Sequence, residues 1–419
     1  MLSAISRYGA RVLPETEDIV AGCKARGELI QGPQIAEFEA AFARRAGMDP
    51  AHAITASYGR MAFYYVLKAL DLPPGSEIVV PALTFWVIPA LAKVAGLKVV
   101  FADVDPATFT LSPAALEHAI TPATRAVVPT HLYGLPCDMA AILDIAARHQ
   151  LRVIEDCAHA LGATWNGRPV GTLGDAGFFS FQTLKPLNCY GGGLALVRDA
   201  AVAARVRALA EGARWPDEKR VTNRLLVGRL QRIFIKPWVF TISAFPILWV
   251  SSLIGANPDV YLWEDIRSLD PLPDAYTERF PNVQAAIGLG ALNALDRWTE
   301  QTRRHARVMD AAFGSVPGIV IPTIPPDRTH VYYQYCVYGP QRDELVVRCV
   351  RRGIDIETLH VDVCSDLELF AGAMVEPPGA PGARQAAGAM QIPVYSTLTD
   401  DQAARVARVV RGVLAQSRP

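Results

Sequence analysis

The sequence predicts an α/β protein built on a mainly parallel sheet, and two observations favour this class. Residues 54–197 alternate short apolar runs with stretches of helical spacing, a pattern typical of a sheet with helices on both faces. Of the 419 residues, 51% are hydrophobic and 20% are charged, which supports a sizeable core. This composition excludes disordered, collagen-like and coiled-coil proteins.

The elements of this sheet can be read in chain order. The apolar runs predict strands at residues 76–80, 97–103, 125–129, 151–156 and 194–197. Helical patterns predict one helix before the first strand, at residues 60–70, and one in each gap between the first four strands, at residues 87–95, 113–120 and 139–149. In such sheets ligands bind beyond the carboxyl ends of the strands. We therefore expect the chemistry among the polar residues that follow each strand.

The second half of the chain predicts a smaller α+β domain. The pattern indicates a long helix at 283–313, a strand at 331–338, a helix at 342–352 that Gly353 ends, and a final helix at 400–415. Either Thr399 or Asp400 is a suitable N-cap for the last helix. We therefore divide the chain into a large domain (1–218), an insert (219–273) and a C-terminal part (274–419).

Charge and cysteine usage narrow the partners and the compartment. Lys and Arg number 41, as do Asp and Glu, and a net charge of zero argues against nucleic acid as the main partner. The seven cysteines are scattered without a CxxC pair, and no HExxH occurs. This pattern fits reduced thiols in a cytoplasmic protein and predicts neither disulfides nor a metal site. The first residues show no signal peptide.

Two polar features lie at predicted strand or helix ends. Asp156 ends an apolar strand, where it is either a helix N-cap or a carboxylate that keeps a heteroaromatic nitrogen protonated. Tyr58, Gly59 and Arg60 stand at the start of a predicted helix. They are either a plain helix start or an anion site, because a helix N-terminus favours negative charge and Arg60 adds a positive one.

A third feature is the polar loop that carries Ser180, Thr183 and Lys185 after an apolar run. Most lysines are solvated, but a partly buried lysine has a depressed pKa and can form Schiff bases. The glycines at 191–193 that follow are either a tight turn or a backbone that passes beside a cofactor. Together with Asp156 and the helix start, the loop indicates a pyridoxal phosphate site, where the protonated ring withdraws electrons from the substrate carbon.

Most of the chain outside residues 219–273 resembles the DegT-type family of sugar aminotransferases, which use pyridoxal phosphate. The resemblance is carried by VIEDCAHALGATWNGRPVGTLGDAGFFSFQTLK, by two upstream segments (PGSEIVVPALTFWVIPALAKVAGLKVVFADVDPATFTL and AVVPTHLYGLPCDM), and by two downstream segments (RFPNVQAAIGLGALNALDRW and QIPVYSTLTDDQAARVARVV). It implies an aspartate-aminotransferase-like fold (pyridoxal phosphate fold type I).

The resemblance also implies residue roles. Lys185 would be the Schiff-base lysine that moves the proton, and Asp156 would pair with the pyridine nitrogen. The remaining cofactor contacts would come from His159 beside the ring hydroxyl, Phe85 on the ring face, and Ser180, Gly59 and Arg60 at the phosphate. Where the family has Ser-Gly-Thr, this chain has Tyr58-Gly59-Arg60, so charge would replace a hydroxyl there.

As an activity, the resemblance implies transfer of an amino group from glutamate to a keto sugar nucleotide, in a homodimer. Two alternatives stay open: another pyridoxal phosphate reaction such as lyase chemistry, and a regulatory protein that keeps the fold without catalysis. Lys185 weighs against the dehydratase branch of the family, in which histidine replaces the lysine.

The insert does not share the resemblance. Residues 219–236 carry six basic residues and no acid, and residues 233–254 are mostly apolar with Pro237 and Pro246 inside. One interpretation is a buried helical insert at a subunit interface or over the site. The other is an element at the inner face of a membrane, contacting the surface through residues 219–254 and suited to a lipid-linked or apolar substrate. The prolines and Lys236 argue against a spanning helix.

Overall fold

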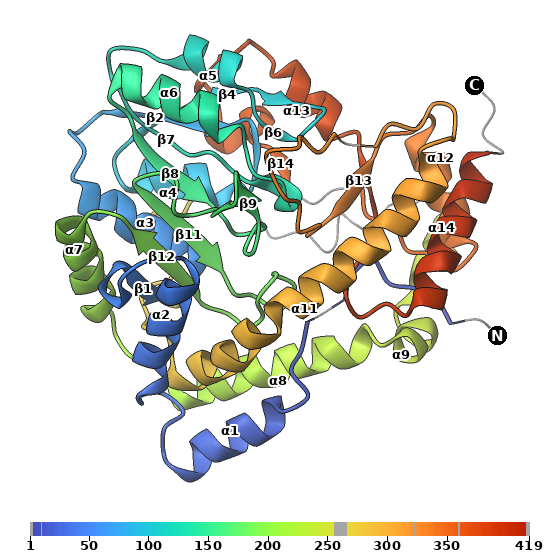
Figure 1. Ribbon diagram of the computed structural model, residues 1–419, viewed down its shortest axis with the longest axis horizontal. Coiled ribbons are helices and arrows are strands. Elements are labelled where there is room, and N and C mark those ends of the chain that lie inside the picture. The colour runs from blue at the N-terminus through green and yellow to red at the C-terminus, as the bar shows by residue number, and fades with distance from the viewer. Residues whose placement is uncertain (1–2, 10, 255–265, 322, 359–360, 416–419) are drawn as a thin grey trace.

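An eight-stranded sheet forms the centre of the large domain (Figure 1). The computed structural model describes residues 3–9, 11–254, 266–321, 323–358 and 361–415. The strands lie in the order β1 (Ala53–Ala56), β12 (Gly193–Val197), β11 (Ala176–Ser180), β8 (Arg152–Asp156), β7 (Thr124–Val127), β2 (Glu77–Pro81), β4 (Lys98–Ala102) and β15 (Met374–Glu376). Among these strands, β12 runs opposite to the other seven, so its pairs with β1 and β11 are antiparallel and the remaining pairs are parallel. The predicted mainly parallel mixed sheet is therefore confirmed.

Helices cover both faces of this sheet because its central strands are apolar on both sides. Ile78 and Val80 pack with α3 (Gly59–Leu70), α4 (Val87–Val94) and α7 (Ala200–Glu211), whereas Val79 packs with α5 (Pro113–Ala119) and α6 (Met139–His149). Successive residues of a strand point to opposite faces, which explains this division. Near β1, β11 and β12, α2 (Gln34–Arg45) belongs to a third apolar cluster.

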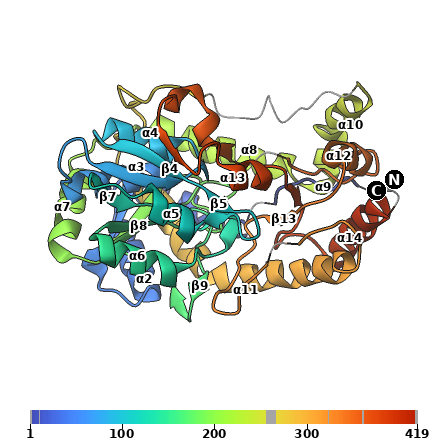
Figure 2. The same ribbon diagram turned by 90° about the horizontal axis from the view of Figure 1, so that it is seen from above.

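The helix α11 (Asn282–Phe313) connects the sheet to a smaller C-terminal domain (Figures 1 and 2). There it packs with α14 (Asp400–Leu414), α12 (Arg342–Val350) and the antiparallel pair of β13 (Tyr335–Val337) and β16 (Met390–Ile392). The predicted long helix and final helix are confirmed, with Thr399 rather than Asp400 as the cap because its side chain forms a capping box with Gln402.

The small domain also receives the start of the chain. Ile5 forms a β-bridge with Ile354, and the buried Arg7 side chain pairs with Asp355 at 2.7 Å. Conversely, the strand β15, which belongs to the C-terminal part of the sequence, pairs with β4 at the edge of the large sheet. The proposed domain boundaries near 218 and 273 remain a prediction.

Short elements complete the described fold. The helices α1 (Thr16–Ala25) and α13 (Pro381–Ala386) lie outside the sheet, and paired short strands are β3 (Leu83–Thr84) with β14 (Asp362–Val363), β5 (Val104–Asp105) with β6 (Thr110–Leu111), and β9 (Thr164–Trp165) with β10 (Arg168–Pro169).

Two predicted elements in the small domain were too long. The strand predicted at 331–338 is reduced to Tyr335–Val337, because Tyr332 has a φ of 50° and the backbone before residue 335 is irregular. A left-handed residue cannot continue a β-ladder. The helix predicted at 342–352 ends at Val350, one turn before Gly353.

The insert forms three connected helices, α8 (Glu218–Phe234), α9 (Pro237–Ile242) and α10 (Phe245–Ile254), which follow one another toward the small domain (Figure 2). Pro237 begins α9, as expected for proline at a first helical position. Residues 255–265 of the insert lie outside the described residues. Among the residues searched, no helix is both long and apolar enough to cross a membrane.

Both interpretations of the insert remain predictions. Apolar side chains such as Trp238 are exposed in the single chain, and either a partner subunit or a membrane surface would cover them. The basic residues do not all face outward. Arg220 pairs with Glu278, Arg229 pairs with Glu17, and Arg224 donates to the Tyr58 hydroxyl. About half of the basic run therefore holds α8 against the body of the protein.

Candidate active site

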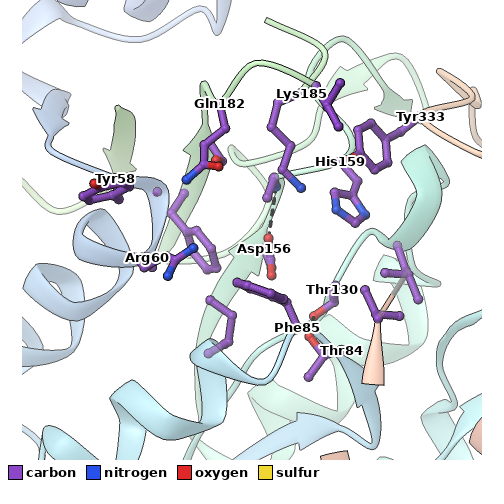
Figure 3. A pocket seen from close by; sticks show the side chains of 18 of the residues that line it. Tyr58, Arg60, Thr84, Phe85, Thr130, Asp156, His159, Gln182, Lys185 and Tyr333 are labelled. Carbon is purple, nitrogen blue, oxygen red and sulfur yellow. Dashed lines mark hydrogen bonds between the residues drawn. The ribbon is translucent and has the colours of Figure 1, made fainter. Parts of the chain in front are cut away.

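A cavity of about 340 Å³ lies beyond the carboxyl ends of β8 and β11. These two strands run parallel, so Asp156 at the end of β8 and Ser180 at the end of β11 reach the same edge of the sheet. The structure brings all of the predicted site residues to this cavity: Gly59, Arg60, Phe85, Asp156, His159, Ser180 and Lys185. Figure 3 shows several of these side chains pointing toward one space. A cavity of this size suits a small organic ligand.

Asp156 is a buried carboxylate at the bottom of the cavity. Its Oδ1 atom accepts a hydrogen bond from the Ala158 N–H at 3.0 Å, and the residues after it form turns rather than a helix. The helix N-cap interpretation is therefore wrong. Burial raises the pKa of Asp156 to about 6, because a charged carboxylate is poorly solvated there. Such a group favours a cationic partner.

Lys185 lies in the loop after β11, and its side chain enters the same cavity (Figure 3). Burial lowers the pKa of Lys185 to about 8; the Asp156 charge opposes this shift and the Arg60 charge adds to it. The Nζ atom lies 4.8 Å from the centre of the Tyr333 ring. A substantial fraction of this amine is therefore neutral near physiological pH, as a nucleophile or base requires.

The start of α3 comes unusually close to the end of β11. A Cβ atom at Gly59 would lie 2.7 Å from the Phe179 carbonyl oxygen and 2.9 Å from the Ser180 Cβ atom, so only glycine permits this approach. The first N–H groups of the helix are thereby placed beside Ser180. Arg60 adds a guanidinium 5.2 Å from the centre of the Phe85 ring. This combination suits an anion such as a phosphate.

The glycines at 191–193 form a turn into β12 and do not line the cavity. Gly192 has a φ of 93° and faces Phe280, while Gly193 packs directly on the Gly59 backbone. Of the two interpretations of this segment, the turn is the one that the structure supports. Its part in the site is indirect, because Gly193 leaves room for the start of α3.

Several lining residues were not singled out from the sequence. Tyr333 stacks on His159 with 4.1 Å between ring centres, and the Tyr8 hydroxyl donates to Glu357. Tyr8 and Tyr333 both line the cavity, as does Gln231 from α8. Tyr333 was assigned to the predicted strand at 331–338, so it was not considered as a site residue. No sequence pattern indicates that Tyr8 or Gln231 belongs to the site. All three come from segments far from Asp156 in the sequence.

A buried polar cluster supports β8 from behind. His131, Glu155 and Cys157 form the group of possible metal ligands found among the described residues, with ligand atoms within 4.8 Å. Glu155 also accepts hydrogen bonds from the N–H groups of residues 171, 173 and 174, and its Oε2 lies 3.0 Å from His131 Nε2. These bonds already satisfy the carboxylate, so the cluster fits a structural role next to Asp156.

The donor set of the cavity fits pyridoxal phosphate. Asp156 suits the protonated ring nitrogen, Lys185 supplies an amine for the aldehyde, and the start of α3 with Arg60 and Ser180 suits the phosphate. Phe85 and His159 remain as partners for the ring, and both line the same space.

Comparisons with known proteins agree with this chemistry. The profile of the DegT/DnrJ/EryC1/StrS aminotransferase family matches residues 14–234 and 257–411. A pleiotropic regulatory protein of Geobacillus stearothermophilus is 31% identical over 408 residues, which cover 96% of this chain and 95% of that protein. The dTDP-3-amino-3,4,6-trideoxy-alpha-D-glucose transaminase of Streptomyces venezuelae is 30% identical, covering 95% of this chain and 91% of its own.

The solved structure of DesV from S. venezuelae is similar with a TM-score of 0.77 and 28% identity, over 96% of this chain and 95% of that chain. This likeness supports the predicted fold. The residues between the two matched ranges of the family profile, 235–256, contain α9 and α10.

Proposed function

This chain belongs to the DegT/DnrJ/EryC1/StrS aminotransferase family, and we propose that it transfers an amino group from glutamate to the keto carbon of a sugar nucleotide or of a lipid-linked or other apolar carbonyl substrate. The observation that carries the proposal is the meeting of Lys185 and Asp156 in one buried cavity. The pKa of Lys185 is lowered to about 8, the direction that a nucleophile and base need. Asp156, with a pKa of about 6, is still mostly ionised at neutral pH.

Pyridoxal phosphate bound in this cavity would draw electrons away from the substrate carbon that loses its proton. Asp156 would hold the proton on the ring nitrogen, which keeps the ring electron-poor. Arg60, Ser180 and the first N–H groups of α3 would hold the phosphate. Phe85 would pack against one face of the ring, and His159 would lie near its hydroxyl.

Lys185 would move the proton. Its Nζ atom, with a pKa near 8, can take a proton from the donor's α-carbon and return it to the neighbouring carbon as general base and then acid. The same transfer in reverse delivers the amino group to the acceptor. Tyr333 covers this amine with an apolar ring, which excludes water from the proton path.

A sugar acceptor is supported by two observations. The Streptomyces venezuelae relative carries the name of a sugar transaminase. The cavity wall also offers hydroxyl and amide groups that suit a polyhydroxylated substrate, including Thr84, Thr130 and Gln182. We also propose that the protein is a homodimer in the cytoplasm. The seven free, buried cysteines support a reducing compartment.

The proposal is tested by adding pyridoxal phosphate to the purified protein. We expect a visible absorption band that borohydride abolishes, and peptide mass analysis should then place the reduced cofactor on Lys185. Amino donors, including glutamate and glutamine, are then supplied with keto-sugar acceptors. Equal amounts of keto acid and aminated sugar indicate transamination. Consumption of one substrate without an amino donor would favour the lyase alternative.

Lys185→Ala is the matched variant. It keeps the phosphate contacts and should bind the cofactor without covalent attachment or turnover. The Geobacillus relative is named as a regulatory protein, so we also test for a regulatory role. Retained biological function in cells that carry only Lys185→Ala would exclude catalysis as the role of this protein.

A further inference from the structure

The three helices of the insert present an apolar surface outward. We call this surface the outer apolar face and define it by Leu226, Leu230, Phe234, Trp238, Ile242 and Ile247. Trp238 is 65% exposed, Ile242 71% and Ile247 67%. Leu226, Leu230 and Phe234 are spaced by four residues on α8, as are Trp238 and Ile242 on α9, so each set forms one helical stripe. Exposed apolar side chains grouped in this way mark an interaction surface.

The opposite side of the same helices is fixed to the protein. The Ala4 N–H donates to Thr241 Oγ1 at 2.7 Å, and Arg351 Nη2 donates to the Ser252 carbonyl at 2.9 Å. Val239 and Phe240 are buried, and Phe240 contacts Phe245 of α10. These contacts fix the orientation of α9 and α10. Because that orientation is fixed, the apolar side chains on the opposite side of the helices point outward.

The insert itself carries charges of one sign. Residues 219–254 contain no Asp or Glu, although Arg229 pairs with Glu17 of α1. Lys236 is exposed directly before the exposed Trp238, whereas Arg232 lies on the other side of α8, against Tyr190. A cation beside an apolar, aromatic surface matches an anionic lipid headgroup above acyl chains.

We propose that the outer apolar face docks on a lipid surface that contains anionic headgroups. Trp238, Ile242 and Ile247 enter the interface, and Lys236 binds a headgroup phosphate. The contact is peripheral, because α9 and α10 lie along the protein. Residues 235–256 fall outside the family profile, so the part of the face on α9 and α10 is an addition to the shared fold.

Docking would also orient the catalytic cavity. The helix α8 carries the outer stripe and, on another side, Gln231, which lines the catalytic cavity. The α8 wall of that cavity is therefore held close to the docked surface. If the proposed function holds, this placement suits an acceptor sugar that is attached to a lipid. The docking itself does not depend on the proposed function.

The test is co-sedimentation of the full-length protein with vesicles of phosphatidylcholine, with and without phosphatidylglycerol. We expect binding about fivefold tighter to the anionic vesicles, as one cation at the surface implies. The double variant Ile242→Asp, Ile247→Asp should lose binding at least about tenfold. Lys236→Gln should lower the preference for anionic vesicles about fivefold.

Two controls separate this result from misfolding and from catalysis. Val320→Asp changes another apolar side chain, 56% exposed and in the small domain, and should bind vesicles like the wild type. All variants should unfold at the wild-type temperature. Lys185→Ala should sediment with vesicles unchanged, so a failed catalytic proposal would leave this one standing.

Failure of the wild type to sediment with either vesicle would overturn the proposal, as would wild-type binding by the double variant. If the double variant instead converted a wild-type dimer into monomers while vesicles were ignored, the face would be a subunit interface and not a lipid-binding surface.

Discussion

The Nζ atom of Lys185 lies 4.8 Å from the centre of the Tyr333 ring, and that ring stacks on His159. The ring therefore shields the amine and fixes the imidazole at once. We expect Tyr333→Ala to lower kcat/KM roughly tenfold to a hundredfold, because both effects are lost. Tyr333→Phe keeps the ring and should stay within about twofold. Equal activities of the two variants in steady-state assays would contradict this role.

The raised pKa of Asp156 has a consequence for stability. Burial disfavours its charged form, so folding carries a cost above the folded pKa of about 6. This cost disappears as the pH falls below the unfolded value of 3.8. Asp156→Asn should therefore raise the free energy of unfolding of the cofactor-free protein near neutral pH, by at most about 3 kcal/mol. This increase in the free energy of unfolding should vanish near pH 4. The kcat of Asp156→Asn with bound cofactor should still fall about a hundredfold or more.

Denaturant titrations at several pH values measure this effect. The exposed Asp144 provides the control, because Asp144→Asn should change the stability little. A loss of stability in Asp156→Asn at neutral pH would show that the carboxylate is stabilised rather than strained in the cavity.

The lowered pKa of Lys185 sets the rate of cofactor attachment. Only the neutral amine attacks an aldehyde, and its fraction falls tenfold per pH unit below a pKa of about 8. The rate constant for attachment of pyridoxal phosphate should rise about tenfold per pH unit up to about pH 8 and then level off. Stopped-flow absorbance measures this profile. A rate that kept rising to about pH 10 would indicate an ordinary solvated lysine.

Gly59 leaves the space in which the start of α3 approaches Ser180. Gly59→Ala would push a methyl group against the Phe179 carbonyl oxygen at 2.7 Å. We expect at least about tenfold weaker pyridoxal phosphate binding, because the phosphate contacts depend on this approach. Gly412 in α14 has open space around it, and Gly412→Ala should leave cofactor affinity unchanged and slightly stabilise the helix. Equilibrium titration of both variants decides the point.

Arg60 would supply a positive charge at the phosphate, at the position where the family usually has a threonine hydroxyl. Arg60→Ala should weaken pyridoxal phosphate binding roughly tenfold to a hundredfold, the loss of one charge-assisted contact. Arg60→Lys should recover part of this affinity, since it keeps the charge but not the planar group over Phe85. Binding that is unchanged in Arg60→Ala would mean that the guanidinium serves its aromatic neighbours and not the phosphate.

The sequence was most informative where one local pattern decides the structure. The strand ending at Asp156, the helix 139–149 and the cap at Thr399 follow from apolar runs and side-chain capping within a few residues. The cavity residues of the large domain were predictable for the same reason. They follow directly after strands or begin a helix, and parallel strands bring such positions to one edge.

The remaining residues could not be predicted because long-range packing places them. Tyr8, Gln231 and Tyr333 reach the cavity from the N-terminal segment, α8 and the loop before β13. Nothing local distinguishes them from other polar or aromatic residues. The helices of the insert were suggested by composition, but the inward-facing arginines were not, because their partners Glu17 and Glu278 lie on other segments.

The first residues of the chain tie the cavity to the small domain. Arg7 is held by Asp355, Ile5 is bridged to Ile354, and the neighbouring Tyr8 lines the catalytic cavity. Any rotation of the small domain relative to the sheet would therefore pull on Tyr8, while Lys185 and Asp156 stayed with the sheet. Tyr333 would stay there too, because the N–H groups of Val331 and Gln334 donate to the carbonyl groups of Gly134 and Tyr133. The site thus has one wall whose position depends on the small domain, beside a catalytic pair whose position does not.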